Sequence, residues 1–438
     1  MTHAFDHLPQ NRASDAYDVI VAGGGSAGVA AAIAAAREGA RTLIVEKAAC
    51  LGGAATLRNV LTYCGLYTLE EAPRPAVAGI AEEVLSELRR MGAVRGPCRF
   101  RGVFVLFDPE AVKTVLDRLC AKAGVDVLFH SLITGADRDE TRILNISLSN
   151  RGGTRRYPAR AFVDATGDCD LAALAPASHR YGNHGSVNMG TLATRFGGIP
   201  RSVSISGNCL ADAVRLAKAR GVRPLSKEQG LFVRLPVSDD MIGYLASEDY
   251  DAREPRSLSH AEAHGREQAW NYLQILRTLP GCEHAYLVAS GPEFGTRESR
   301  HLNAIYQLRW QDVQCDTRFE DTVALGTWAS EFHSRETLES TFTLPPKPTY
   351  DIPLGCLMSS DTRNLFAGGR TADGDQRVGA SLRVMGTAFA TGQAAGVAAA
   401  HFADFGNTDA ARVRAALTSQ GALLDRNALP PAVELVEP

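Results

Sequence analysis

Three glycines near the start of the chain have the spacing of a phosphate-binding turn. Gly23, Gly25 and Gly28 form the pattern GxGxxG. The first glycine permits a tight turn, the second lets the backbone approach a pyrophosphate, and the third lets a helix pack closely on a strand. The N-terminus of the following helix would offer N–H groups and a partial positive charge to that anion. The structural alternative is a glycine turn in an ordinary α/β domain.

An acidic residue follows where ribose recognition needs one. Glu46 lies roughly 20 residues after the glycines, at the end of a second apolar segment. Its carboxylate can accept hydrogen bonds from ribose hydroxyls, and its charge disfavours a 2′-phosphate. A second glycine patch, LGGAAT at 51–56, follows directly. Its glycines would let the backbone pass close to a flavin, which favours FAD over NAD, although the patch alone could be any loop.

Two further small-residue segments could complete a cofactor site. Residues 165–168 (ATGD) follow a strand-like segment and could line the adenosine half of the cofactor, or form a simple strand-end turn. Residues 364–396 combine a strand, a glycine loop and a small-residue helix. We expect that helix to begin near Ser381 and to aim its N-terminus at the flavin, where its dipole would favour an anionic reduced ring. Gly392 and Gly396 would also allow close packing of this helix on the sheet.

Candidate substrate-binding residues lie in the middle of the chain. The segment GTRESR places Arg297 and Arg300 on either side of an acid, a spacing suited to holding a carboxylate or to a structural salt-bridge cluster. His333 could exchange a proton as hydride moves to or from flavin N5, or be a satisfied or exposed histidine. His260 and His264 have metal-ligand spacing, but the pattern lacks a third ligand, so we expect a solvated face and no metal.

The elements that must position these residues alternate as in an α/β fold. Short apolar runs rich in β-branched residues predict strands, and apolar positions at helical spacing predict helices. The expected strands are residues 17–22, 41–46, 125–129 and 161–165, and the expected helices are residues 28–37, 77–92 and 109–124, the last with Asp108 as its N-cap. This order predicts a parallel sheet.

The pattern changes from about residue 190 to 350. Helical segments near 208–221 and 260–278 mix with strand-like pieces such as 285–289, and the α/β pattern returns at Asn364. We therefore predict a Rossmann-like FAD-binding domain with a parallel sheet, discontinuous over 17–190 and 350–405. An inserted α+β substrate or cap domain would occupy residues 191–349. We expect a flexible tail at 1–16 and a C-terminal helical extension at 406–438.

The composition is that of an ordinary globular protein. Of 438 residues, 45% are hydrophobic and 22% are charged, and the net charge of −3 favours neither nucleic acid nor anionic membrane as a partner. The nine cysteines form no CxxC pair, which indicates free thiols in a reducing compartment. The polar first 16 residues do not resemble a signal peptide, and no apolar stretch reaches the ~18 residues of a membrane span. We therefore expect a cytoplasmic protein.

Taken together, these segments resemble a known family. They are similar to the FAD-dependent oxidoreductases of the two-dinucleotide-binding-domain flavoproteins, which are distantly similar to fumarate reductase flavoprotein subunits. The resemblance spans nearly the whole chain, and beside the fingerprint, Glu46 and LGGAAT it is carried by ATGDCDLAALA (165–175), GTRESR (295–300), WASEFH (328–333), DIPLGCL (351–357), NLFAGGR (364–370) and SLRVMGTAFATGQAAGVAAA (381–400).

The resemblance implies FAD bound in an extended form, with its adenosine near Glu46 and its flavin near the C-terminal loop and helix. The segment after Arg370, TADGDQRVGA, is more charged than the family pattern, so its charges could tune the flavin or face the substrate. The residues expected to contact or surround FAD are Gly23, Gly25, Ser26, Ala27, Gly28, Glu46, Lys47, Gly52, Gly53, Ala54, Thr56, Ile133, Thr166, Gly167, Asp168, Gly369, Arg370, Arg383 and Val384.

The expected function is that of a FAD-dependent oxidoreductase. It would transfer hydride between a small polar organic substrate and flavin N5, with Arg297, Arg300 and His333 as catalytic residues and an unassigned electron acceptor or donor. One alternative is a flavin monooxygenase that uses a separate or transiently bound NAD(P)H reductant. Another is a dinucleotide-binding protein without redox chemistry. The sequence leaves the oligomeric state open, with a homodimer as one possible assembly.

Overall fold

The computed structural model describes residues 16–437. Its central feature is a seven-stranded sheet in the order β6-β2-β1-β9-β8-β7, with β20 pairing with β9 off this path. The parallel strands are β1 (Tyr17–Ala22), β2 (Thr42–Val45), β6 (Asp126–Leu128), β9 (Gly153–Asp164) and β20 (Leu365–Ala367). The second half of β9 joins this parallel sheet, and its first half pairs antiparallel with β8 (Ile143–Asn150), which pairs with β7 (Leu132–Arg138).

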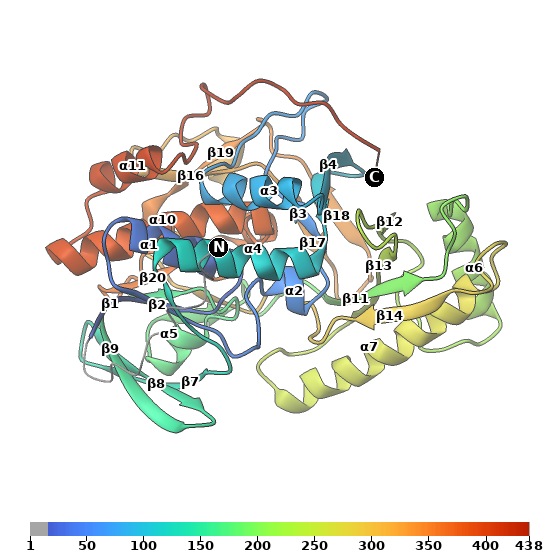
Figure 1. Ribbon diagram of the computed structural model, residues 1–438, viewed down its shortest axis with the longest axis horizontal. Coiled ribbons are helices and arrows are strands. Elements are labelled where there is room, and N and C mark those ends of the chain that lie inside the picture. Colours follow the sequence, from blue (N-terminus) through green and yellow to red (C-terminus); the bar gives the residue numbers. More distant parts are fainter. Residues whose placement is uncertain (1–15, 438) are drawn as a thin grey trace, which may run out of the picture.

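Helices cover one face of the parallel strands (Figure 1). They are α1 (Ser26–Arg37), α3 (Ile80–Arg90), α4 (Pro109–Ala123) and α10 (Met385–Phe405). In α10, a Cβ on Gly392 or Gly396 would lie 2.1 Å from the carbonyl oxygen of Ala27 or Ala31 in α1. The glycines therefore let α1 and α10 approach more closely than any larger residue would allow. We call the sheet and these helices the nucleotide-binding part. Its segments come from both ends of the chain, as predicted.

Two local predictions about helix ends had different outcomes. Asp108 caps α4, because its carboxylate accepts hydrogen bonds from the backbone N–H groups of Glu110 and Ala111 at 3.0 and 2.9 Å. The C-terminal helix does not begin near Ser381. A short helix, α9 (Gln376–Leu382), ends there, and α10 restarts after Val384, whose backbone is extended.

A smaller α+β unit lies beside the nucleotide-binding part (right side of Figure 1). Its antiparallel sheet has the order β12-β13-β11-β14, and α7 packs on β11 and β13. We call it the inserted part, and its elements are β11 (Gly190–Gly197), α6 (Gly207–Ala219), β12 (Phe232–Arg234), β13 (Met241–Glu248), α7 (Pro255–Leu276) and β14 (Tyr286–Ser290). A second hydrophobic core lies between this antiparallel sheet and α7, as expected for an α+β insertion in a Rossmann-like fold.

Short elements connect the two parts. A three-stranded sheet is formed by β3 (Thr62–Cys64), β5 (Val103–Phe107) and β4 (Val94–Arg99). The strand pairs are β10 (His179–Tyr181) with β15 (Arg300–Leu302), β16 (Thr322–Gly326) with β19 (Tyr350–Pro353), and β17 (Ser330–His333) with β18 (Ser340–Thr343). The short helices are α2 (Ala54–Leu57), α5 (Asp170–Leu174), α8 (Trp310–Gln314), η1 (Leu354–Leu357) and η2 (Gly369–Thr371).

The C-terminal segment is helical only in α11 (Ala410–Ser419). The chain then runs extended to β4, where the N–H of Val436 donates to the Pro97 carbonyl (Figure 1). Arg426 anchors this segment through a buried ion pair with Asp351 at 2.8 Å. The expected tail at 1–16 lies, except for its last residue, outside the described residues. Within residues 16–437, no helix is both long and apolar enough to cross a membrane.

Candidate active site

The GxGxxG turn between β1 and α1 has the geometry that its glycines predict. Gly23 has a φ of +95°, and a Cβ on Gly28 would lie 1.8 Å from the Gly23 carbonyl oxygen, so glycine is required at both positions. No side chain of the described residues caps α1. A Cβ on Gly25, the N-cap residue, would have its nearest heavy atom, the Gly53 Cα, at 3.9 Å. There is therefore room for an anion beside an uncapped helix N-terminus.

Glu46 lies next to this turn at the end of β2. Its side chain is buried, and its two carboxylate oxygens accept hydrogen bonds from the N–H groups of Gly24 at 2.7 Å and Ala48 at 2.9 Å. Each oxygen keeps a second lone pair, which a ribose hydroxyl could use. The neighbouring Lys47 is 55% exposed and pairs with Glu293 at 3.7 Å. Glu46 is thus fixed beside the glycine turn, whereas Lys47 points to the protein surface.

The second glycine patch packs against the first. Gly52 forms a β-bridge with Gly25, and a Cβ on Gly53 would lie 2.9 Å from the Gly25 Cα. Gly52 and Gly53 have φ values of +113° and +52°, a backbone region that favours glycine. The Thr56 hydroxyl donates to the Leu51 carbonyl at 2.7 Å and so closes the loop. Two patches that are separate in the sequence therefore form one glycine-lined surface.

Two largely buried arginines near this surface pair with Asp168, and each keeps one donor without a partner. The Arg370 Nη2 is 3.3 Å from Asp168 Oδ1, and the Arg58 Nη2 is 4.0 Å from Asp168 Oδ2. Although burial alone would raise it, the charges of Arg370 and then Arg58 lower the pKa of Asp168. Among the described residues, nothing bonds to the buried Arg370 Nη1 or to the Arg58 Nε. Orphaned donors next to an uncapped helix fit an anionic dinucleotide such as FAD.

The other residues expected at FAD fall into three groups. Ala54, Arg370, Arg383 and Val384 line the large cavity described below. Ser26 and Ala27 form the first turn of α1, Thr166 and Gly167 lie beyond β9, and Gly369 donates its N–H to the Thr391 hydroxyl at 3.0 Å. Ile133 lies in β7, two residues after Ser131, whose backbone N–H donates a hydrogen bond to the Glu46 carbonyl.

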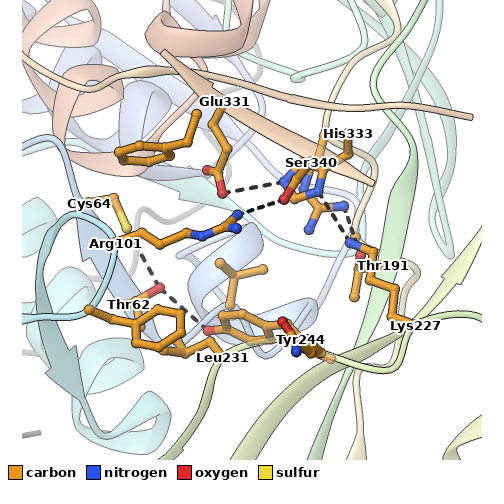
Figure 2. A pocket seen from close by; sticks show the side chains of 18 of the residues that line it. Thr62, Cys64, Arg101, Thr191, Lys227, Leu231, Tyr244, Glu331, His333 and Ser340 are labelled. Carbon is orange, nitrogen blue, oxygen red and sulfur yellow. Dashed lines mark hydrogen bonds and ion pairs between the residues drawn. The ribbon is translucent and has the colours of Figure 1, made fainter. Parts of the chain in front are cut away.

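A cavity of about 1050 Å³ opens between the nucleotide-binding part and the inserted part. Figure 2 shows that polar side chains from several elements converge on it. Thr62 comes from β3, Tyr244 from β13, and Glu331 and His333 come from β17. Its walls therefore combine residues that are far apart in the chain, as is usual for a binding site between domains.

Arg297 and Arg300 do not converge. Arg297 lines the cavity, where its Nη1 donates to the Met189 carbonyl at 2.6 Å and to the Thr191 hydroxyl at 2.7 Å. The Arg300 Nη1 pairs instead with Asp170 at 3.1 Å, outside the cavity lining. The expected clamp formed by these two arginines is therefore not present.

Arg383 lies near Arg297 in the cavity wall, although the resemblance placed it at FAD. Burial, and then the charge of Arg383, lower the pKa of Arg297 to about 10. The Arg383 Nη2 pairs with Glu331 Oε2 at 3.1 Å and donates to the Glu331 carbonyl at 3.0 Å. Of these two neighbouring guanidinium groups, only that of Arg383 is paired with a carboxylate.

Glu331 and His333 lie on the same face of β17, two residues apart. Glu331 Oε1 is 3.5 Å from His333 Nε2 (Figure 2). Burial lowers the pKa of His333 well below its usual range, and the positive charge of Arg297 acts in the same direction. The pKa of Glu331 is lowered: burial alone would raise it, but the His333 hydrogen bond and the Arg383 charge dominate. The pair thus consists of a neutral imidazole and a carboxylate.

Sequence reasoning missed Lys227. It lies in the coil between α6 and β12, and its Nζ is 3.2 Å from His333 Nδ1 (Figure 2). No motif surrounds Lys227 in the sequence, so no local signal marks it. Glu331 could have been found from its spacing, because residues i and i+2 of a strand share a face.

Other singled-out residues serve local structure. Asp373 is buried and pairs with Arg180 at 2.8 Å, and Asp375 caps α9 through the Arg377 and Val378 N–H groups. The two aspartates of the charged loop after Arg370 therefore stabilise the local structure of that loop and of α9. His264 pairs with Glu248 at 2.5 Å, and within the described part of the chain no group of three potential metal ligands occurs.

Comparison with known proteins identifies a family. The family model described as FAD dependent oxidoreductase matches residues 18–418. No curated protein sequence matches the chain. Similar solved structures include a geranylgeranyl bacteriochlorophyll reductase-like protein from Thermoplasma acidophilum, with 13% identity, a TM-score of 0.45, and coverage of 93% of this chain and 82% of that one. The myxobacterial chondrochloren halogenase CndH has 15% identity and a TM-score of 0.48, over 92% and 78% of the two chains. These structures say nothing about the substrate.

Proposed function

The chain belongs to the FAD-dependent oxidoreductase family, and from this premise we propose that it transfers hydride between FAD and a small organic carboxylate in the cavity of Figure 2. FAD, when bound, supplies the two-electron chemistry. The residues of this chain bind the carboxylate, orient it, and exchange a proton with it.

The unpaired charge of Arg297 carries the proposal. Within residues 16–437, its guanidinium has neutral partners, the Met189 carbonyl and the Thr191 hydroxyl, and no carboxylate forms an ion pair with it. A desolvated cation without a counter-charge is costly. A substrate carboxylate would supply that counter-charge, with the planar guanidinium as a suitable partner.

The position of Arg297 agrees with this role. The same cavity is lined by Ala54 and Val384, both expected at the flavin, so substrate and cofactor would share one space. Its volume of about 1050 Å³ is at the upper end of the range for small-molecule sites. The cavity therefore has room for a flavin ring and an organic acid side by side.

Ligand binding by the oxidised, FAD-loaded protein tests the proposal. The visible flavin spectrum is recorded during titration with acetate, lactate and benzoate, and with the matching amides. We expect a saturable spectral change with at least one acid and a much weaker change with its amide. Only the acid carries a negative charge that can form an ion pair with Arg297. Equal responses to acids and amides would contradict the proposed substrate class.

A further inference from the structure

We propose that Lys227 exchanges the proton at the reacting atom of the substrate, and that His333 and Glu331 are positioning residues that hold it there. The inference rests on the proposed function, because it assigns a proton carrier to the same cavity. It also changes the role expected for His333, which becomes a support for Lys227.

The geometry forms a chain of polar contacts across the cavity wall. Arg383 pairs with Glu331 at 3.1 Å, Glu331 faces His333 Nε2 at 3.5 Å, and His333 Nδ1 lies 3.2 Å from the Lys227 Nζ. A neutral imidazole next to a carboxylate keeps its proton on Nε2. Nδ1 is then an acceptor, so Lys227 donates to it and keeps its other Nζ positions for a ligand in the cavity.

The backbone of Lys227 is fixed to the inserted part. The Tyr272 hydroxyl of α7 donates to the Lys227 carbonyl at 2.5 Å. The neighbouring Ser226 hydroxyl donates to the Leu245 carbonyl at 3.0 Å and accepts from the Ser247 N–H at 2.8 Å, both in β13. Both ends of the side chain are thus held, at the backbone by α7 and β13 and at the Nζ by β17.

Charges around Lys227 favour a group that can lose its proton. Burial, and then the positive charge of Arg297, lower the pKa of Lys227 to about 7. Arg383 and Arg101 act in the same direction, and Glu331 acts against them. Since the pKa of His333 is held well below its usual range, the imidazole stays neutral where Lys227 titrates. Lys227 is therefore better suited than His333 to proton exchange near neutral pH.

The step balances for a 2-hydroxy carboxylate. The C2–H bond breaks, and hydride leaves to the flavin that the family provides as oxidant. The hydroxyl O–H bond breaks, and its proton moves to the neutral Lys227 amine. A C2=O double bond forms, so the substrate loses two electrons and two hydrogens, and Lys227 then returns its proton to water.

Competitive labelling of amines tests the assignment without turnover. FAD-loaded protein without substrate receives a trace of acetic anhydride at a series of pH values, and peptide mass spectrometry follows Lys227 and the exposed Lys122 separately. Lys227 should reach half of its maximal reactivity near pH 7, below the pH of about 10.4 that is ordinary for a lysine. A Lys227 midpoint near that ordinary value overturns the proposal.

Two variants test the positioning residues in the same assay. Glu331→Gln removes the negative charge that favours the ammonium form, so the Lys227 midpoint should fall. His333→Ala removes the Nδ1 acceptor and should also shift the midpoint down, whereas His333→Asn, which keeps an acceptor, should shift it less. Retained flavin absorbance shows that each variant is folded. An unchanged midpoint in both Glu331→Gln and His333→Ala overturns their role.

The catalytic part is tested with the acid that perturbs the flavin spectrum. Lys227→Met should slow anaerobic flavin reduction by about 100-fold or more with little change in acid affinity, while Lys122→Met should not. An undiminished rate in Lys227→Met overturns the assignment. A protein that binds no carboxylate but keeps the low Lys227 midpoint contradicts the proposed function and leaves the Lys227 geometry standing.

Discussion

The positively charged Arg297 donates hydrogen bonds to two neutral oxygens, those of the Met189 carbonyl and the Thr191 hydroxyl. Nearby Arg383 is compensated by Glu331. The two arginines therefore have different tasks in the proposed reaction. Arg297 binds the substrate carboxylate, and Arg383 fixes Glu331, which in turn orients His333 and Lys227.

Truncation of Arg297 should weaken substrate binding without loss of FAD. We expect Arg297→Ala to raise the Kd of the best carboxylate by about 30-fold or more, because removal of one partner of a desolvated ion pair costs roughly 2–5 kcal/mol. Spectral titration gives the Kd, and released FAD gives the occupancy. Arg300→Ala is the matched control, because Arg300 pairs with Asp170 outside the cavity lining. Equal losses in both variants would favour a general structural role for the segment.

The rate of substrate oxidation should depend on pH through Lys227. Only the neutral amine accepts a proton, and with a pKa lowered to about 7 its fraction grows as pH rises. We expect the rate of anaerobic flavin reduction to rise about tenfold per pH unit below pH 7 and to level off above it. Stopped-flow traces at several pH values measure this. A rate that falls as pH rises through 7 would point to an acid as the catalytic group.

Single residues were predictable only where a short pattern marked them. Arg297 and His333 were singled out because they stand in charged, polar segments; both line the cavity, and their catalytic role stays a prediction. The direction in which the Arg300 side chain points could not be predicted from the spacing, because it depends on how β15 pairs with β10. Lys227 was missed because its tertiary contacts with His333 and Tyr272 define its place, and no local sequence pattern marks it.

Among the elements, the turn between β1 and α1 offers the sharpest test of cofactor geometry. Gly25 has room for a side chain in the protein alone, whereas a Cβ on Gly28 would collide with the Gly23 carbonyl at 1.8 Å. We expect Gly25→Val to fold but to lose FAD, because its side chain fills the space assigned to the pyrophosphate. Gly28→Ala should instead destabilise the protein. Thermal melts and flavin occupancy separate the two effects, and full FAD occupancy in Gly25→Val would contradict the assigned site.

Elements were predicted well where apolar runs and glycine turns are local. The strands at 17–22 and 41–46 and the α4 cap all depend on neighbouring residues, and the structure contains them. The predicted start of α10 was wrong because a contact with a segment distant in the sequence determines where this helix begins. A Cβ on Gly386 would lie 2.5 Å from the Cys64 carbonyl oxygen, so the first turn of α10 is placed against β3.

At the scale of the whole molecule, the candidate site lies where the nucleotide-binding part and the inserted part meet. The nucleotide-binding part carries the glycine turns, Glu46 and Arg383, and the inserted part with its flanking coil carries Lys227 and Tyr244. This division follows from the return of the α/β pattern at Asn364, which the sequence shows. How the two parts face each other depends on contacts between distant segments, which no local pattern encodes.

Removal of FAD should therefore destabilise the whole protein. Binding to the folded state alone contributes about 2.7 kcal/mol when free FAD is 100 times its Kd. We expect a lower melting temperature for the apoprotein and its recovery on addition of FAD, measured by circular dichroism. Gly25→Val is the control, because it should not respond to FAD. An apoprotein with an unchanged melting temperature would mean that FAD contributes little to the folded state.

Anaerobic titration of the FAD-loaded protein with 2-hydroxy and 2-amino carboxylates tests the central claim most directly. The flavin absorbance is followed for each acid, for its amide, and for NADH and NADPH. We expect one class of carboxylate to bleach the flavin and its amide to leave it oxidised, with the bleaching slowed in Arg297→Ala. Bleaching by a nicotinamide nucleotide and by none of the acids would contradict the account and favour a monooxygenase.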